Sequence, residues 1–205
     1  MKVDLKIDKK IFNEAYYPYL FNYSHRYEVF YGGAGSGKSV FVAQKLLIKA
    51  LKEKRKILVI RKVMATQLNS CWQLFLDTLS NFHLLEFTKI NKANFKIELP
   101  NGSIFLFAGV DDVEKLKSIA GITDIWIEEA TELNEDEFLQ LDLRLRAKVG
   151  AQQIVLSFNP ISKANWCYKR WFARPQDENT FILKTIYKDN RFLPQSYIKS
   201  LEKTM

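Results

Sequence analysis

Eight consecutive residues in the first fifth of the chain have the composition and spacing of a phosphate-binding loop. They are Gly32, Gly33, Ala34, Gly35, Ser36, Gly37, Lys38 and Ser39. Glycines let the backbone fold into a nest whose N–H groups point at phosphate oxygens. Lys38 can contact the β- and γ-phosphates of a nucleotide, and the Ser39 hydroxyl can ligate Mg²⁺. This Walker A pattern predicts binding of ATP and Mg²⁺, because an accidental match occurs in about one such chain in a hundred.

Two adjacent carboxylates end an apolar run later in the chain. The apolar residues 125–127 precede Glu128 and Glu129. A strand that ends in paired acids is typical of a Walker B segment, in which Glu128 holds the Mg²⁺ shell and Glu129 orients or deprotonates the attacking water. The alternative is a solvated acidic turn, in which the charge of Glu132 favours the start of the next helix.

A third polar interruption follows the next apolar run. Residues 157–160 read Ser-Phe-Asn-Pro, and Pro160 ends the run. Placed beside the γ-phosphate, Asn159 could sense whether that phosphate is present and pass the change to the rest of the domain. The alternative is that Asn-Pro only initiates a turn.

Strands and helices must alternate if these groups are to meet. The residue patterns predict strands at 27–31, 57–60, 95–99, 104–107, 125–127, 154–158 and 181–187, and helices at 39–52, 65–81 and 135–147, and residues 196–203 form a short amphipathic stretch. The strands at 95–99 and 104–107 flank Pro100, Asn101 and Gly102, which indicates a β-hairpin. Parallel strands joined by helices predict an α/β fold, because such connections place helices on both faces of a sheet.

Composition limits the class of protein. The chain has 205 residues, of which 47% are hydrophobic, enough for one well-buried core and too few for two large ones. Its net charge of +8 favours an anionic partner such as nucleic acid, although a solvated basic surface would give the same value. Cys71 and Cys167 are expected to be buried free thiols. A charged N-terminus and the lack of long apolar runs predict a soluble, intracellular protein with no membrane partner.

Taken in order, the motifs resemble the ATPase part of phage terminase large subunits. The similar segments are the glycine loop, the acidic segment 126–132, the Leu-Asp-Leu-Arg-Leu-Arg segment 141–146 and the Ser-Phe-Asn-Pro segment 157–160. The resemblance covers about 26–187. It implies a RecA-like P-loop NTPase of the additional-strand catalytic-glutamate class, with a mostly parallel central sheet flanked by helices and a β-hairpin insertion.

The same resemblance implies a function and a setting. Such proteins hydrolyse ATP to translocate double-stranded DNA into the procapsid, assemble as a ring on the portal protein and work with a small terminase subunit. They act in the host cytoplasm and are not stable components of the virion. We expect residues 1–205 to form a single ATPase domain with a core at about 26–187. Residues 188–205 would then be a linker toward a nuclease domain outside this chain.

Two departures from the family pattern concern charge. Many relatives carry an arginine at the position of Ala34, and many carry aspartate at the position of Glu128. Hydrolysis still needs a cation at the transferring phosphate, so a neighbouring subunit is expected to supply it. The candidates are Arg144 and Arg146, with Arg61 behind them, and the alternative for each is a solvated or ion-paired helix charge.

Two other functions fit parts of the pattern. A helicase- or recombinase-type DNA-dependent ATPase of the same fold would carry the same Walker motifs. A nucleotide-gated DNA-binding module that does not turn over would require Glu129 to be idle. Basic residues are scattered along the chain, so the sequence does not locate a DNA-contacting surface.

Overall fold

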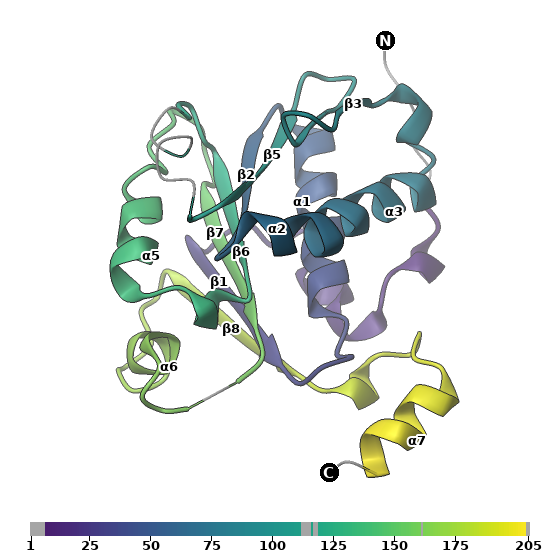
Figure 1. The fold of residues 1–205 in the computed structure, drawn as a ribbon, viewed down its shortest axis with the longest axis vertical. Coiled ribbons are helices and arrows are strands. Elements are labelled where there is room, and N and C mark those ends of the chain that lie inside the picture. Colours follow the sequence, from purple (N-terminus) through teal and green to yellow (C-terminus); the bar gives the residue numbers. More distant parts are fainter. Residues whose placement is uncertain (1–6, 112–115, 117–118, 161, 204–205) are drawn as a thin grey trace.

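One eight-stranded sheet forms the centre of the protein (Figure 1). The computed structural model describes residues 7–111, 116, 119–160 and 162–203. The strands are β1 (Tyr27–Gly32), β2 (Lys56–Arg61), β3 (Lys89–Asn91), β4 (Lys96–Glu98), β5 (Ile104–Gly109), β6 (Asp124–Glu128), β7 (Gln153–Phe158) and β8 (Thr180–Thr185). Their order across the sheet is β3-β4-β5-β2-β6-β7-β1-β8. All neighbours from β5 to β8 in that order are parallel, and β3 and β4 add an antiparallel edge.

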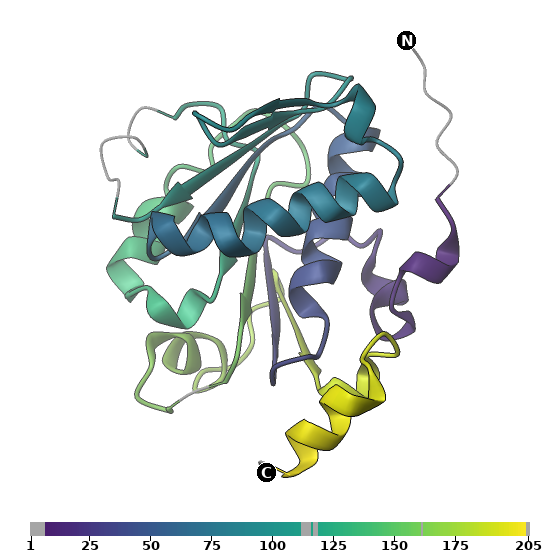
Figure 2. The ribbon, with the colours of Figure 1, turned by 45° about the vertical axis from the view of Figure 1, so that its right-hand side comes forward.

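Helices cover both faces of this sheet. They are α1 (Lys38–Lys52), α2 (Met64–Gln67), α3 (Gln73–Asn81), α5 (Glu135–Asp142), α6 (Trp166–Trp171) and α7 (Gln195–Lys203). Shorter helical turns are η1 (Lys9–Ile11), η2 (Glu14–Tyr19), the π-helical η3 (Leu68–Trp72), η4 (Leu85–Phe87), η5 (Ala130–Glu132) and η6 (Tyr187–Asp189). α1 and α3 pack on one face and α5 and α6 on the other, while α7 lies beside the N-terminal turns (Figures 1 and 2).

Alternation along the strands divides the apolar core in two. In β2, Ile57 and Val59 join the cluster beneath α1 and α3, whereas Leu58 and Ile60 join the cluster beneath α5 and α6. Successive side chains of a strand point to opposite faces, so a strand that is covered on both sides is apolar throughout. All four of these side chains are fully buried. The continuous apolar runs of the sequence therefore belong to the parallel centre of the sheet.

Most of the predicted elements are confirmed, including the hairpin formed by β4 and β5. Three boundaries are wrong, because the helix predicted at 65–81 is divided into α2, η3 and α3, the strand predicted at 181–187 ends at Thr185, and the helix predicted at 135–147 ends early. In addition, β3 was not predicted. The side chains of 66–69, including that of Leu68, lie outside the described set. Both cysteines are buried free thiols, as expected.

The helix predicted at 135–147 ends at Asp142. The Asp142 carboxylate accepts hydrogen bonds from Arg26, at 2.6 Å, and from the Tyr27 hydroxyl, at 2.8 Å. The interaction of an acidic side chain with the negative end of a helix dipole is also unfavourable. The chain then turns so that Leu145 is buried while Leu143 stays 71% exposed. The Leu-Arg-Leu-Arg segment thus lies beyond the helix and not within it.

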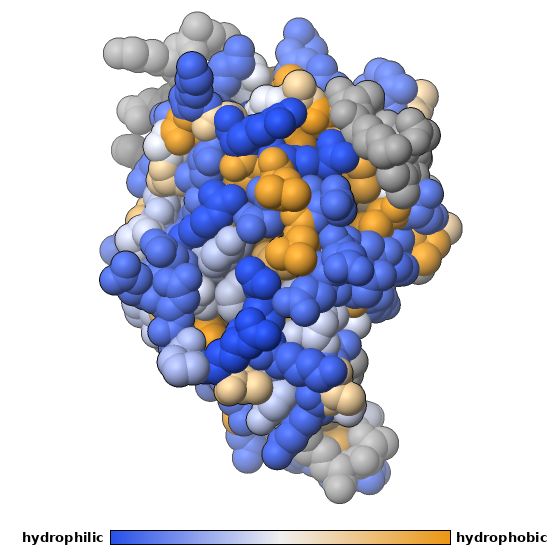
Figure 3. All heavy atoms as spheres, turned by 90° about the vertical axis from the view of Figure 1, so that its left-hand side faces the viewer, coloured by the Kyte–Doolittle hydropathy of each residue, from blue (hydrophilic) through white to orange (hydrophobic). Residues whose placement is uncertain are grey.

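The face that α5 and α6 present to solvent is largely hydrophilic, with a limited apolar area (Figure 3). No helix among the described residues has the length and apolar character needed to cross a membrane.

Candidate functional site

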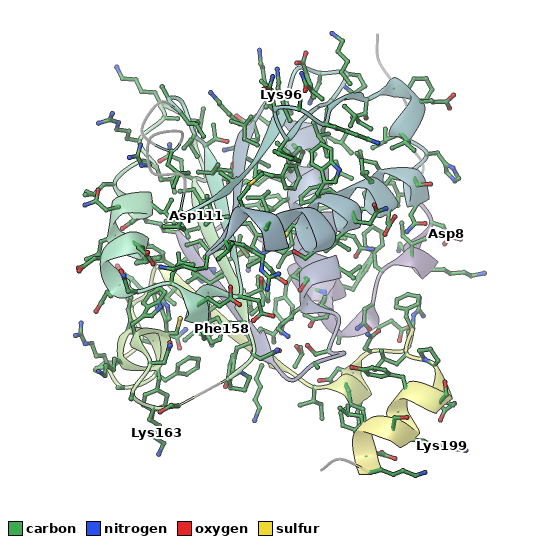
Figure 4. All side chains as sticks on the ribbon, viewed as in Figure 1. Asp8, Lys96, Asp111, Phe158, Lys163 and Lys199 are labelled. Atoms are coloured by element: carbon green, nitrogen blue, oxygen red, sulfur yellow. The ribbon has the colours of Figure 1, made fainter. Side chains whose placement is uncertain are left out.

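The glycine loop, the paired acids and Asn159 meet at the carboxyl ends of three adjacent strands. β7 lies between β1 and β6, and Tyr31 pairs with Phe158 while Glu128 pairs with Ser157. Figure 4 labels Phe158, the last residue of β7, at this edge of the sheet. Parallel sheets bind ligands at their carboxyl edge, where loops from neighbouring strands converge. The convergence that the sequence predicts is therefore present.

Two glycines of the loop are required by the backbone. A Cβ added to Gly32 would lie 1.7 Å from the carbonyl oxygen of Thr185, so β8 can approach only because this side chain is absent. Gly37 has a φ of 83° and is the N-cap of α1. Left-handed backbone of this kind favours glycine. The first turn of α1, with its unpaired N–H groups and positive dipole, thereby opens onto the loop.

Lys38 is a buried cation held by neutral acceptors. Its Nζ donates to Oδ1 of Asn159 at 2.7 Å and to the carbonyl of Gly33 at 3.3 Å. Burial lowers the pKa of Lys38, and the charges of Glu128 and Glu129 oppose that shift. Among the described residues, none offers Lys38 a carboxylate within ion-pair distance. An incoming anion can therefore replace two neutral contacts without breaking an ion pair.

Glu128, at the end of β6, is hydrogen-bonded to both the glycine loop segment and β7. Its Oε1 accepts a hydrogen bond from the Ser39 hydroxyl at 2.7 Å, and its Oε2 accepts one from Ser157. Trp126, fully buried, donates from Nε1 to the Ser157 hydroxyl at 2.7 Å and so fixes that partner. Burial raises the pKa of Glu128, an effect that the two serine hydrogen bonds oppose. A carboxylate of this kind is stabilised when a cation binds beside it.

Glu129 leaves the strand with an unusual backbone. Its φ of 52° and ψ of 50° are left-handed, which is uncommon for a side chain of this size. This conformation directs the chain out of β6 and into η5. Glu129 directly follows Glu128, whose carboxylate accepts the hydrogen bond of Ser39 beside Lys38, and the charge of Glu129 opposes the lowering of the Lys38 pKa. Glu129 is only partly exposed, as expected for a group at the rim of a cleft.

The candidate arginines occupy different places. Arg61 ends β2 beside β6, with Nη2 3.7 Å from Glu132 and Nη1 3.3 Å from the Ser70 hydroxyl. Arg144 donates to the carbonyl of Leu116 at 2.8 Å, and Arg146 is exposed. Arg61 thus lies at the end of the strand beside β6, which carries the paired acids. The assignment of a trans-acting cation to Arg144 or Arg146 stays a prediction.

Two supports of the glycine loop were not predicted. The Tyr16 hydroxyl bonds to the carbonyl of Ser36 at 3.0 Å and to the Thr185 hydroxyl at 2.7 Å, while its ring stacks on Phe41. Asn190 donates to the carbonyl of Gly35 at 2.8 Å. Tyr16 is therefore a packed core residue. Residues so distant in sequence carry no local pattern that would connect them with the loop.

A cavity of about 360 Å³ opens beside Gly37. Its walls come from the N-terminal turns, the first half of α1 and the segment before α7. The buried side-chain amide of Asn13 lies next to Gly37, and its Nδ2 has no hydrogen-bond partner among the described residues. An unpaired buried donor at a cavity wall suits a polar ligand atom, because leaving it unpaired is unfavourable.

The oxygen atoms around Ser39 and Glu128 fit Mg²⁺. This ion prefers oxygen ligands and keeps several waters, so one or two protein oxygens suffice beside phosphate. No cluster of three or more His, Cys, Asp or Glu side chains suited to a metal occurs within the described part of the chain. The donor set therefore suits a nucleotide-associated magnesium ion better than a fully protein-ligated metal.

A phosphate-binding loop, an acid-tipped strand and a third strand inserted between them define a P-loop NTPase of the additional-strand class. The chain belongs to the phage terminase large subunit family, whose model matches residues 24–205. It is 34% identical to the PBSX phage terminase large subunit of Bacillus subtilis (strain 168), over 94% of this chain and 49% of that protein.

The fold is also similar to solved large terminases. The large terminase of a thermophilic bacteriophage superposes with a TM-score of 0.80 at 13% identity, over 95% of this chain and 50% of that one. The same terminase in complex with ATP-γ-S gives a TM-score of 0.78, over 95% of this chain and 49% of that one, again at 13% identity. The chain thus spans about half the length of these relatives.

Proposed function

We propose that this chain is the ATP-hydrolysing motor of a large terminase subunit, which drives double-stranded DNA into the procapsid. The observation that carries the proposal is the meeting of Lys38, Ser39, Glu128 and Asn159 through two hydrogen bonds of 2.7 Å. Membership of the terminase family supplies the biological setting.

Binding of the triphosphate follows from the loop. Backbone N–H groups of the loop and of the first turn of α1 surround the phosphates, and Lys38 exchanges the Asn159 amide for phosphate oxygen. Ser39 and Glu128 would hold Mg²⁺, which would neutralise phosphate charge when bound. The cavity beside Gly37 accepts the nucleoside, with Asn13 as a donor to it.

Hydrolysis requires a water aligned with the γ-phosphate. Glu129 orients this water or accepts its proton, while the adjacent Glu128 would keep its separate role as a metal ligand. Asn159 loses its contact with Lys38 when phosphate arrives and regains it after release. It therefore reports the state of the γ-phosphate to β7 and to the segment that follows.

The direct test is phosphate release by the wild type and by Glu129→Gln. We expect a fall of about 10²- to 10⁴-fold, the usual range for loss of a general base, with nucleotide affinity retained. Asp136→Asn, an exposed acid in the first turn of α5, is the control and should release phosphate like the wild type. Equal release from wild type and Glu129→Gln would remove the catalytic assignment, and release no higher than a protein-free blank from both would favour the nucleotide-gated module.

A neighbouring subunit in a ring on the portal is the proposed source of the missing cation. Such a group contributes about 10³ to 10⁵ in rate, or roughly 4 to 7 kcal/mol. Mixing Glu129→Gln with the double variant Arg144→Ala/Arg146→Ala tests this, because a double-variant subunit keeps Glu129 and can receive the arginines of a Glu129→Gln neighbour. If the mixture hydrolyses ATP no faster than the two variants do separately, Arg144 and Arg146 are not the trans donors.

DNA, the portal protein and the small terminase subunit are the proposed partners, and the host cytoplasm is the proposed location. DNA binding should be weak and independent of sequence, because phosphate contacts dominate such binding. Its affinity should fall steeply between low and physiological salt for two duplexes of unrelated sequence. A salt-independent affinity, or a strong preference between the duplexes, would contradict a translocating role.

A further inference from the structure

Two side chains of α6 hold the loop that follows Glu129. Trp166 donates from Nε1 to the carbonyl of Ala130 at 3.2 Å, and Asn165 donates from Nδ2 to the carbonyl of Thr131 at 3.0 Å. Both acceptors belong to η5, the turn between the paired acids and α5. No other side-chain donor is described for these two carbonyls, so α6 provides their side-chain support within the described residues.

This loop needs support because Glu129 has a left-handed backbone. A non-glycine residue in that conformation is strained, and it persists where the surrounding structure holds it. Its own turn supplies two backbone bonds, from the Glu132 N–H to the Glu129 carbonyl at 2.9 Å and from the Leu133 N–H to the Ala130 carbonyl at 3.2 Å. Trp166 adds a second donor at the Ala130 carbonyl, and Asn165 adds a side-chain donor at the Thr131 carbonyl.

α6 is itself fixed and can serve as a support. The Trp166 ring lies 5.0 Å from that of Phe138 in α5, and Arg170 Nη1 lies 3.2 Å from Glu135 Oε1. At the end of the loop, Asn134 and Glu137 form a capping box that fixes the start of α5. The Glu129 loop therefore lies between two helices that are joined to each other.

The connection to β7 makes this support relevant to the reaction. Asn159 follows β7, and residues 160–164 lead from it to Asn165, the N-cap of α6. Lys163, within this segment, is labelled near α6 in Figure 4. The residue that contacts Lys38 and the residue that holds the Glu129 loop are thus joined by a short stretch of chain.

We propose that Asn165 and Trp166 are positioning residues that set the orientation of Glu129 toward the water that attacks the γ-phosphate. The inference rests on the proposed ATP hydrolysis and adds residues to that same site. Both side chains act through the backbone of η5 and not through contact with the nucleotide.

Two variants remove the bonds and keep the surrounding structure. Asn165→Asp retains an oxygen that caps the Cys167 N–H and loses the donor to Thr131. Trp166→Phe retains an aromatic ring against Phe138 and loses the donor to Ala130. Trp171→Phe is the matched control, because the buried Trp171 Nε1 has no hydrogen-bond partner among the described residues.

We expect kcat to fall about tenfold in Asn165→Asp and in Trp166→Phe, with nucleotide affinity and Tm close to those of the wild type. A tenfold loss corresponds to about 1.4 kcal/mol of transition-state stabilisation. Trp171→Phe should keep kcat within about twofold, since it removes no hydrogen bond. Unchanged kcat in both variants, or an equal loss in Trp171→Phe, would overturn the inference.

A double-variant cycle separates positioning from general stability. In the Glu129→Gln background, Trp166→Phe should lower the residual rate by less than about twofold, because its effect passes through Glu129. The same tenfold fall in both backgrounds would show that Trp166 acts independently of Glu129 and would overturn the proposal. A wild type that does not hydrolyse ATP would instead refute the proposed function, so the two failures are distinct.

Discussion

Helix α1 carries three buried lysines, and their partners differ between its two ends. Toward the carboxyl end, Lys45 lies 2.8 Å from the carboxylate of Glu28, and Lys49 lies 2.6 Å from that of Asp124. At the amino end, Lys38 contacts the Asn159 amide and the Gly33 carbonyl. Burial lowers the pKa of all three lysines, and in the first two a partner carboxylate opposes the shift at short range.

The difference separates structural charges from a binding charge. Lys49 also donates to the carbonyl of Ala151 and to Gln153, so its three donors are all used. A buried lysine with a complete set of fixed partners joins α1 to the sheet and has no capacity for a ligand. Among the described residues, Lys38 donates to two neutral acceptors at the carboxyl edge. One edge of the sheet thus stabilises the fold while the opposite edge stays available for an anion.

The largest effect is expected from removing a buried ion pair near the carboxyl end of α1. Lys49→Met leaves the buried Asp124 carboxylate without its closest cation, which should lower the free energy of unfolding by about 3 to 5 kcal/mol. Denaturant unfolding measures this directly, and Lys52→Met, on an exposed side chain of the same helix, should cost less than about 1 kcal/mol. Equal losses in both variants would abolish the distinction between buried and exposed charges.

At the amino end of α1, substitution of Lys38 should weaken nucleotide binding and leave stability unchanged. Lys38→Met removes a charge-assisted contact with phosphate and should weaken nucleotide binding by about 1.5 to 3 kcal/mol, or roughly 10- to 150-fold. Stability should not fall, because no buried carboxylate loses its ion-pair partner. Titration with a fluorescent ATP analogue and an unfolding curve give the two quantities. A loss of stability as large as that of Lys49→Met would contradict the comparison.

The smallest effect concerns pH. Burial raises the pKa of Glu128 in the folded protein. Its contribution to the free energy of unfolding is therefore fully present below the unfolded pKa of about 4.3, and it is lost as the pH rises through the folded pKa. Without Mg²⁺ or nucleotide, Glu128→Gln should therefore gain stability over the wild type at about pH 7 and not at about pH 4.

Glu98 provides the control of opposite sign. Hydrogen bonding and charge from Lys96 lower its pKa, so its stabilising contribution is present above its unfolded pKa and is lost as pH falls through the folded pKa. Glu98→Gln should consequently lose stability at about pH 7. The same sign of change for both variants would show that the environment of Glu128 does not disfavour its charge.

The sequence predicts the role of Lys38 at the amino end of α1 far better than the roles of Lys45 and Lys49 toward its carboxyl end. Gly37, Lys38 and Ser39 belong to a contiguous pattern, because the backbone nest and its lysine are local in the chain. Lys45 and Lys49 have helical spacing but look like solvent-facing charges, since Glu28 and Asp124 are distant in sequence. Their burial follows from tertiary packing that no local pattern reports.

Contacts between residues distant in sequence are equally hard to predict around the Glu129 loop. The spacing of apolar residues predicts β6, β7 and the paired acids, and the meeting of Glu128 with Ser39 follows from the parallel order of strands. It does not predict that Trp166 bonds to Ala130, because that contact depends on how α6 returns to the sheet. The early end of α5 has a similar cause, since Asp142 is held by Arg26 from the start of the chain.

The most direct test of the central claim is a crystal structure of this chain with Mg²⁺ and ATP-γ-S. We predict that Lys38 leaves Asn159 and contacts phosphate oxygen, that the metal lies between Ser39 and Glu128, and that Glu129 faces the γ-phosphate. A nucleotide bound elsewhere, with the contact between Lys38 and Asn159 intact, would contradict this mechanism.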